Sequence, residues 1–86
     1  MSEVIIYSTG RCPMCSKTKD LLNKWNISFI EKRVDTDRSA LKEMAQLTDG
    51  ARTVPQISIK GRWIGGFMDL TEMHMNDELD DLMGVN

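Results

Sequence analysis

The sequence predicts an α/β fold with elements in the order β-α-β-α-β-β-α, arranged as a four-stranded mixed sheet with helices on both faces. Two observations support this prediction. Apolar, β-branched segments recur at residues 3–8, 27–34 and 56–59, as expected for strands. Between them lie two segments with helix signals, since Pro13 suits a first helical turn and Gly50 suits a helix terminator. A single sheet covered on both faces buries the apolar side of every such element.

The first half of the chain predicts a strand, a helix and a second strand. Residues 3–8 are β-branched and aromatic, which is typical of a buried strand. A helix with one apolar face is expected from Pro13 to about Asn26. Residues 27–34 form the second strand, half exposed towards its end. Because a helical crossover joins the two strands, we expect them to be parallel.

The second half predicts a helix, a hairpin and a final helix. Residues 38–47 carry apolar side chains at helical spacing. Residues 56–59 and 62–64 are two strands joined by a tight turn, so they should pair as an antiparallel hairpin. The final helix is expected to start near Asp69, and the sequence leaves open whether residues 76–77 interrupt it.

Length and charge limit what kind of protein this is. Eighty-six residues suffice for one domain, so we expect residues 1–86 to form a single unit. The net charge is −2, and residues 64–86 hold 6 of the 13 acids but none of the 11 lysines and arginines. This balance argues against a general nucleic-acid binder. No apolar run approaches the ~20 residues that cross a bilayer, and the N-terminus lacks a secretory pattern. We therefore expect a monomeric, soluble, cytoplasmic protein with no nucleic-acid or membrane partner.

The two cysteines, Cys12 and Cys15, stand three positions apart, directly after the first predicted strand. A disulfide between them closes a very small loop, so it would constrain the unfolded chain little. A lone C-x-x-C beside a strand–helix–strand pattern indicates a redox-active dithiol. Two alternatives remain open: a zinc site that recruits His74, although zinc needs about four ligands, and an inert pair of buried thiols. The hydroxyl of Tyr7, near the end of that strand, is expected to face the site.

The two thiols are expected to have different roles. Cys12 should lie at the start of the helix, where unpaired backbone N–H groups favour a negatively charged sulfur. Its pKa should therefore lie well below the ~8.5 of a free thiol, with Arg11 and Lys17 or Lys19 adding positive potential. Cys15 lies one turn inside the helix and is shielded. We expect Cys12 to attack the substrate disulfide and Cys15 to resolve the mixed disulfide that forms.

Three motifs in order give the chain a resemblance to the glutaredoxin family. They are Cys12-Pro13-Met14-Cys15, then Thr53-Val54-Pro55-Gln56-Ile57, then Gly65-Gly66 with Asp69-Leu70. The similarity spans nearly the whole chain. It implies a thioredoxin-like fold and the reduction of protein disulfides and protein–glutathione mixed disulfides, with glutathione as co-substrate and electron source. Ribonucleotide reductase is a frequent substrate in this family, and neither a tightly bound cofactor nor a metal is expected.

The resemblance also implies which residues bind glutathione. A cis peptide bond before Pro55 would present the backbone of Val54 to the cysteinyl part of glutathione. Gly65 and Gly66 would let the backbone come close to the γ-glutamyl end, with helix N–H groups holding its carboxylate and Asp69 pairing with its ammonium. Ordinary structural roles, a proline at a strand start and an acid at a helix start, are the alternatives. The expected glutathione-binding residues are Arg11, Met14, Thr53, Val54, Pro55, Gly66, Phe67, Met68 and Asp69.

The chain departs from the family pattern at several positions. Met14 stands where dithiol members commonly have Tyr, and Thr9 stands where a Lys often pairs with the glycyl carboxylate. Met68 is a poor helix cap. These changes leave open a glutaredoxin-like electron donor that is reduced by thioredoxin reductase. A module that binds an iron–sulfur cluster between two chains is also open, although Pro13 disfavours it because its ring would crowd the cluster.

Overall fold

The computed structural model describes residues 3–83 and contains one four-stranded sheet with helices on both of its faces. The ends of the expected domain, residues 1–2 and 84–86, lie outside the described part. The elements in chain order are β1 (Val4–Ser8), α1 (Pro13–Lys24), β2 (Phe29–Arg33), α2 (Arg38–Leu47), β3 (Gln56–Ile59), β4 (Arg62–Gly65), α3 (Phe67–Met75) and α4 (Glu78–Met83).

The strands lie in the order β2-β1-β3-β4, which makes the sheet mixed. The β1 and β2 strands are parallel, with Val4 opposite Phe29. The β3 strand runs antiparallel to both β1 and β4. The predicted parallel pair and the predicted hairpin are therefore both confirmed. The hairpin contains an irregularity between Ile57 and Ser58, where the register along β4 shifts.

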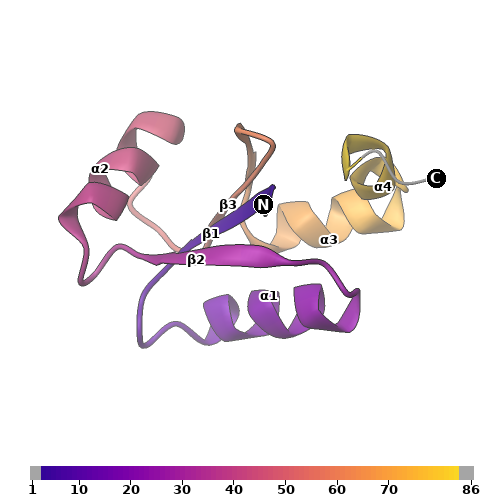
Figure 1. The fold of residues 1–86 in the computed structure, drawn as a ribbon, viewed down its shortest axis with the longest axis horizontal. Helices are drawn as coiled ribbons and strands as arrows, with labels where there is room; N and C mark the ends of the chain where they lie inside the picture. Colours follow the sequence, from indigo (N-terminus) through magenta and orange to yellow (C-terminus); the bar gives the residue numbers. More distant parts are fainter. Residues whose placement is uncertain (1–2, 84–86) are drawn as a thin grey trace.

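Two apolar cores lie on opposite faces of the sheet (Figure 1). The larger core lies under α1, α3 and α4, because alternate strand residues point to that face. Its buried residues are Val4, Ile6, Leu22, Ile57, Ile59, Leu70 and Leu79. The smaller core lies under α2 and contains Tyr7, Val34, Ala40 and Met44. The α2 helix contacts β1 and β2, at one side of this sheet face.

The end of α1 and the limits of β2 differ from the prediction. The helix ends at Lys24 because Asn26 adopts a left-handed φ of 59° and the N–H of Ile27 returns to the carbonyl of Leu22 at 2.9 Å. Asparagine tolerates this conformation better than most residues. The chain then needs two more residues before it pairs with β1, so β2 begins at Phe29 rather than at residue 27.

The final helical region is divided into α3 and α4, which settles the question that residues 76–77 left open. Asp77 adopts a φ of 60°, and its N–H returns to the carbonyl of His74 at 3.2 Å, so the first helix stops there. The break allows Leu70 and Leu79 to bury their side chains in the same core. Within residues 3–83, no helix is both long and apolar enough to cross a membrane.

Candidate active site

Cys12 is the residue that caps the start of α1. Its backbone is extended, with φ −116° and ψ 103°, and Pro13 is the first helical residue. Proline suits this position because the N–H that it lacks would have no helical partner. The Sγ of Cys12 accepts a hydrogen bond from the backbone N–H of Cys15 at 3.0 Å. The predicted placement of the first sulfur at a helix N-terminus is therefore confirmed.

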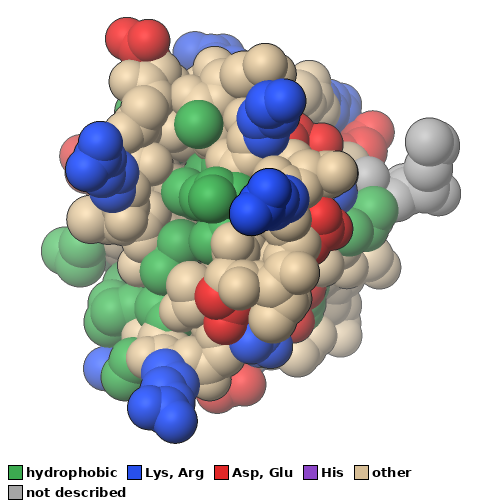
Figure 2. Space-filling model, turned by 90° about the vertical axis from the view of Figure 1, so that its left-hand side faces the viewer, with side chains coloured by type: hydrophobic (Ala, Val, Ile, Leu, Met, Phe, Trp, Pro, Cys, Tyr) green, Lys and Arg blue, Asp and Glu red, His purple; other side chains and the backbone are tan. Residues whose placement is uncertain are grey.

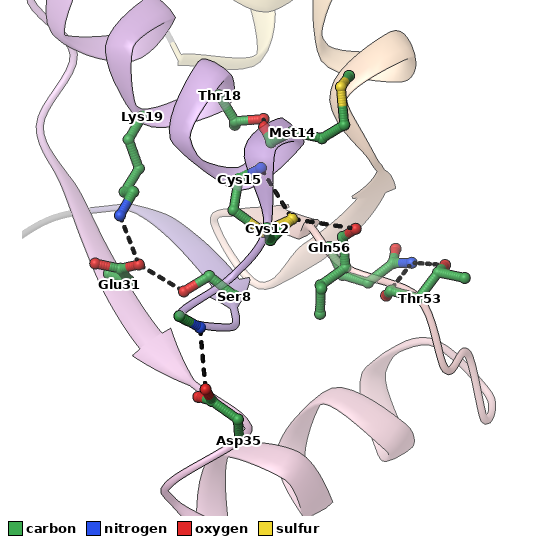
Figure 3. The surroundings of a disulfide bond; sticks show 12 residues. Ser8, Cys12, Met14, Cys15, Thr18, Lys19, Glu31, Asp35, Thr53 and Gln56 are labelled. Carbon is green, nitrogen blue, oxygen red and sulfur yellow. Dashed lines mark hydrogen bonds and ion pairs between the residues drawn. A yellow bond between two sulfur atoms is a disulfide. The ribbon is translucent and has the colours of Figure 1, made fainter.

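The two cysteines form a disulfide, and their Cα atoms lie 5.1 Å apart (Figure 3). Cys15 is 1% exposed, whereas Cys12 is half-buried, so the sulfur that a second molecule can reach belongs to Cys12. The Sγ of Cys12 also lies 3.7 Å from the carbonyl oxygen of Val54. An attacking partner would approach Cys12 alongside that carbonyl.

Positive charge near the disulfide is less available than the sequence suggested. Lys19 forms an ion pair with Glu31 at 2.9 Å, and the same carboxylate oxygen accepts a hydrogen bond from Ser8 at 2.6 Å (Figure 3). The Ser8 bond, followed by Lys19, holds the pKa of Glu31 below its usual value. This pairing leaves the charge of Lys19 less available to a Cys12 thiolate, and the contribution of Lys17 or Lys19 to that thiolate stays a prediction. Arg11 is exposed beside Cys12.

A hydrogen bond connects the loop between β1 and α1 to the segment that follows β2. The backbone N–H of Gly10 donates to Asp35 at 3.0 Å (Figure 3). Arg33 donates to both oxygens of the same carboxylate, at 2.9 Å and 2.8 Å. The Arg33 bonds, followed by the Gly10 N–H, hold the pKa of Asp35 well below its usual range. These contacts connect the residues that precede Cys12 to the sheet.

The expectation that the Tyr7 hydroxyl faces the disulfide is wrong. Its side chain is 2% exposed on the sheet face under α2, and its hydroxyl donates to the carboxylate of Glu43. Strand alternation explains this, because Val4 and Ile6 point towards α1 and Tyr7 therefore points the other way. Burial, followed by the bond to Glu43, raises the pKa of Tyr7.

An open groove of about 370 Å³ begins beside the disulfide. All of the predicted glutathione-binding residues except Arg11 line it, and it includes the Val54–Pro55 segment, whose peptide bond is cis. The lining residues are Met14, Thr53, Val54, Pro55, Gln56, Trp63, Gly65, Gly66, Phe67, Met68 and Asp69. Figure 2 shows the side of the molecule that lies on the left in Figure 1, where apolar side chains gather and both basic and acidic side chains lie around them.

The far end of the groove is the start of α3, which begins at Phe67 rather than near Asp69. The carboxylate of Asp69 reaches back to accept the backbone N–H of Gly66 at 2.9 Å, so the helix starts before the acid. Gly65 adopts a φ of 114°, and a Cβ at that position would collide with the Asp69 carboxylate. Glycine is therefore required at position 65 for this arrangement. Met68 lies inside the first turn and is 72% exposed, so it is not the cap.

Two groove residues, Gln56 and Trp63, were missed by the sequence reasoning. Ile57 and Ile59 point into the larger core, so alternation alone places Gln56 on the opposite face, towards the cis proline. Trp63 pairs with Ser58 on that same face. The strand pattern could have identified both residues.

His74 is far from the cysteines. Its ring stacks on Trp25 with the ring centroids 3.8 Å apart, at the end of α1 opposite Cys12. A helix of this length spans roughly 18 Å, so His74 cannot join a zinc site with the two sulfurs. Among residues 3–83, no group of three or more His, Cys, Asp or Glu residues could hold a metal ion.

The family model described as glutaredoxin matches residues 4–64. This chain belongs to the glutaredoxin family. A glutaredoxin of Neisseria meningitidis is 39% identical over 84 residues, covering 96% of this chain and 98% of the relative. Glutaredoxin 3 of Escherichia coli is 37% identical over 83 residues, covering 96% of this chain and 99% of that glutaredoxin.

Solved glutaredoxin structures share the fold. A buckwheat glutaredoxin–glutathione complex superimposes with a TM-score of 0.82 at 26% identity, covering 95% of this chain and 76% of that one. A glutaredoxin from Brucella melitensis has a TM-score of 0.78 at 34% identity, covering 96% and 89%. The fold is thus thioredoxin-like, as the resemblance implied. Family membership and the Cys12–Cys15 pair make this glutaredoxin a thiol–disulfide oxidoreductase.

Proposed function

We propose that this glutaredoxin depends on glutathione and reduces both protein disulfides and protein–glutathione mixed disulfides, with Cys12 as the attacking thiol. The position of the Cys12 sulfur is the observation that best supports the proposal. It caps a helix, it belongs to the more exposed of the two cysteines, and it lies beside a groove that can take a small peptide. The reducing cytoplasm is the proposed site of action, because it keeps such dithiols reduced.

The proposed reaction with a protein–glutathione mixed disulfide needs one thiol. The Cys12 thiolate attacks the glutathione sulfur, the S–S bond of the substrate breaks, and the protein leaves as a thiolate that takes up a proton. A second glutathione, as its thiolate, then attacks the glutathione sulfur bound to Cys12. Glutathione disulfide leaves, and Cys12 is a thiolate again. One free glutathione is consumed: the protein sulfur becomes a thiol, and the glutathione from the substrate leaves joined to the free one as glutathione disulfide.

The proposed reaction with a protein disulfide needs both thiols. Cys12 attacks one substrate sulfur and releases the other as a thiol. Cys15 then attacks the Sγ of Cys12, which releases the second substrate thiol and leaves the Cys12–Cys15 disulfide. Two glutathiones reduce that disulfide in turn. The structure supports this assignment because Cys15 is buried directly beneath Cys12, with its Cα 5.1 Å away. One chain holds both sulfurs, so we propose that it acts as a monomer.

The groove supplies complementary chemistry for glutathione. The proposed contact for the cysteinyl backbone is the main chain of Val54, whose carbonyl lies 3.7 Å from the Cys12 sulfur. Asp69 uses one carboxylate oxygen for the Gly66 N–H, and its second oxygen is proposed to meet the γ-glutamyl ammonium. Arg11 is proposed to approach the glycyl carboxylate from outside the groove. The proposed walls are Met14, Thr53, Pro55, Phe67 and Met68. A buckwheat glutaredoxin of the same fold has been solved as a complex with glutathione, which supports the proposal that this chain also binds glutathione.

A comparison of two reductants tests the proposal. The protein is assayed on a glutathionylated peptide and on a protein disulfide, once with glutathione plus glutathione reductase and once with thioredoxin reductase alone. Turnover with glutathione, and none with thioredoxin reductase, is the expected result. Turnover that requires thioredoxin reductase would overturn the glutathione dependence. In the same assay Cys15→Ser should keep the reaction with the glutathionylated peptide and lose the reaction with the protein disulfide.

A further inference from the structure

Trp63 occupies an unusual position for a large aromatic side chain. It lies on the edge strand β4, is 42% exposed, and lines the groove that starts beside the disulfide. Its strand partner is Ser58, which points to the sheet face opposite the larger core. The α2 helix contacts β1 and β2 on this face, whereas Trp63 lies on β4, at the other edge of the sheet.

The Trp63 indole makes one directed contact inside the groove. Its Nε1–H donates to the Oε1 of Gln56 at 2.8 Å. An indole N–H can only donate, so the partner atom must be the amide oxygen of Gln56. This leaves the amide nitrogen of Gln56 on the other side, where it donates to the carbonyl oxygen of Thr53 at 3.0 Å and to its hydroxyl at 3.2 Å (Figure 3). Trp63 therefore fixes the orientation of the Gln56 amide.

The Gln56 amide in turn holds a segment that lies outside the sheet. Thr53 precedes β3, so its carbonyl is not part of the strand ladder, and the buried Gln56 side chain supplies the donor in place of a strand. The next residue along the chain is Val54, whose carbonyl lies 3.7 Å from the Cys12 sulfur. A continuous series of contacts thus connects the Trp63 indole to the backbone that faces the reactive sulfur.

We propose that Trp63 is a positioning residue that determines how tightly this protein binds the glutathione part of its mixed-disulfide substrates. The inference rests on the proposed glutathione dependence, because it assumes that the Thr53–Val54 backbone contacts glutathione. Without the indole N–H, the Gln56 amide can rotate, and the Thr53 carbonyl then loses its fixed donor. The helix start that carries Cys12 is untouched, so substrate binding should weaken while the reactivity of the thiol stays the same.

The variant Trp63→Phe tests this, because it keeps an aromatic ring and removes the donor. We expect the KM for a glutathionylated peptide to rise roughly three- to tenfold, as for the loss of one hydrogen bond, with kcat changed less than about twofold. The rate of Cys12 alkylation against pH should not change. Trp25→Phe is the matched control, since Trp25 stacks on His74 at the far end of α1, and its KM should equal that of the wild type.

A second variant separates positioning from general loss of structure. Gln56→Met keeps the volume of the side chain and removes the amide, so it should raise KM as much as Trp63→Phe does. The double variant should show no further increase, because both changes break the same contact series. An unchanged KM in folded Trp63→Phe, or fully additive effects in the double variant, would overturn the inference. A fall in kcat of Trp63→Phe together with a shifted pH profile of Cys12 alkylation would also overturn the inference.

Failure of the proposed function has a different signature. If the wild-type protein does not turn over the glutathionylated peptide with glutathione, the glutathione dependence itself is wrong. If the wild type does turn it over and the KM of Trp63→Phe is unchanged, the glutathione dependence stands and the role of Trp63 is wrong. Far-UV circular dichroism and a thermal melt of each variant establish that the proteins compared are folded.

Discussion

The start of α1 and the start of α2 have nearly the same geometry and different consequences. Cys12 and Asp37 cap the two helices with extended backbones, at φ −116° and −123°. Each side chain accepts hydrogen bonds from the first helical turn: Asp37 from Ser39 at 2.9 Å and from Ala40 at 3.3 Å, and Cys12 from Cys15 at 3.0 Å. A sulfur thus occupies in α1 the position that a carboxylate occupies in α2.

The difference lies in the chemistry of the capping atom and in its surroundings. A carboxylate is already an anion at neutral pH, so the cap of α2 contributes only to stability. A thiol becomes an anion only when it loses a proton, so in the dithiol form the same helix start would favour the thiolate. The Cys12 sulfur also lies beside the groove, whereas Asp37 is exposed at the start of α2 and does not line that groove. The comparison shows how one helix-terminus interaction can serve stability in one place and reactivity in another.

The largest effect should come from replacing the sulfur that caps α1. Cys12→Ser should lose essentially all activity with every disulfide substrate, because the serine hydroxyl is not ionised near neutral pH. Serine is itself a good cap, so α1 should persist, and the thermal midpoint should match that of the reduced wild type to within a few degrees. Residual turnover above about 1% of wild type in a coupled glutathione assay would contradict the role of Cys12.

A third helix start can be compared with these two. In α3, Asp69 lies inside the first turn and accepts a hydrogen bond from the backbone N–H of the capping residue, Gly66. Asp69→Ala removes the acceptor of the Gly66 N–H and a proposed ligand of the glutathione ammonium. We expect a stability loss of about 1 kcal/mol and a rise in KM for glutathionylated peptide of roughly tenfold. Denaturation curves and steady-state kinetics measure the two effects. A stability loss with an unchanged KM would limit Asp69 to a structural role.

The carboxylate cap of α2 should matter for stability alone. Asp37→Ala leaves the N–H groups of Ser39 and Ala40 without this acceptor, so urea denaturation should show a loss of about 1 kcal/mol. Both kcat and the pH dependence of Cys12 alkylation should stay as in the wild type. A shifted alkylation profile in this variant would show that the two helix starts are not independent.

The smallest effect concerns the ion pairs on the two sides of the sheet. Lys32 and then Tyr7 hold the pKa of Glu43 below its usual value, and Ser8 and then Lys19 do so for Glu31. Because these folded-state pKa values are depressed, the stabilisation is present above about pH 4.5 and is lost as the pH falls further through them. Both pairs are partly exposed, so each should contribute less than about 1 kcal/mol.

The matched variants Glu43→Gln and Glu31→Gln check this effect. Urea midpoints measured at pH 7 and pH 3 should fall by less in each variant than in the wild type, because each variant lacks one of the groups that must be protonated. An equal fall in the wild type and in both variants would show that the pairs contribute nothing to acid stability.

Much of the fold could be predicted from local patterns. The bounds of α2 and β3 agree with the expected ranges, and α1 begins directly after Cys12 as Pro13 indicated. The errors lie at element ends, where the cause is a single backbone conformation. The left-handed residues Asn26 and Asp77 end their helices, and few sequence signals distinguish such residues from exposed helical ones.

Prediction of the site was limited by long-range side-chain contacts. The resemblance supplied the segments that line the groove, and the structure brings them together. The pairing of Lys19 with Glu31, and that of Tyr7 with Glu43, depends on which strands and helices face one another, so the order of elements alone could not reveal either contact. The bond between Trp63 and Gln56 joins two side chains on one sheet face, and alternation along the strands predicts that face but not the contact itself.

The most direct test of the account is the pH dependence of the alkylation rate of Cys12 in reduced Cys15→Ser, which keeps the backbone N–H that contacts the sulfur. If the start of α1 stabilises the thiolate, the midpoint should lie at least about one pH unit below the ~8.5 of a free thiol. A midpoint at or above that value would contradict the account.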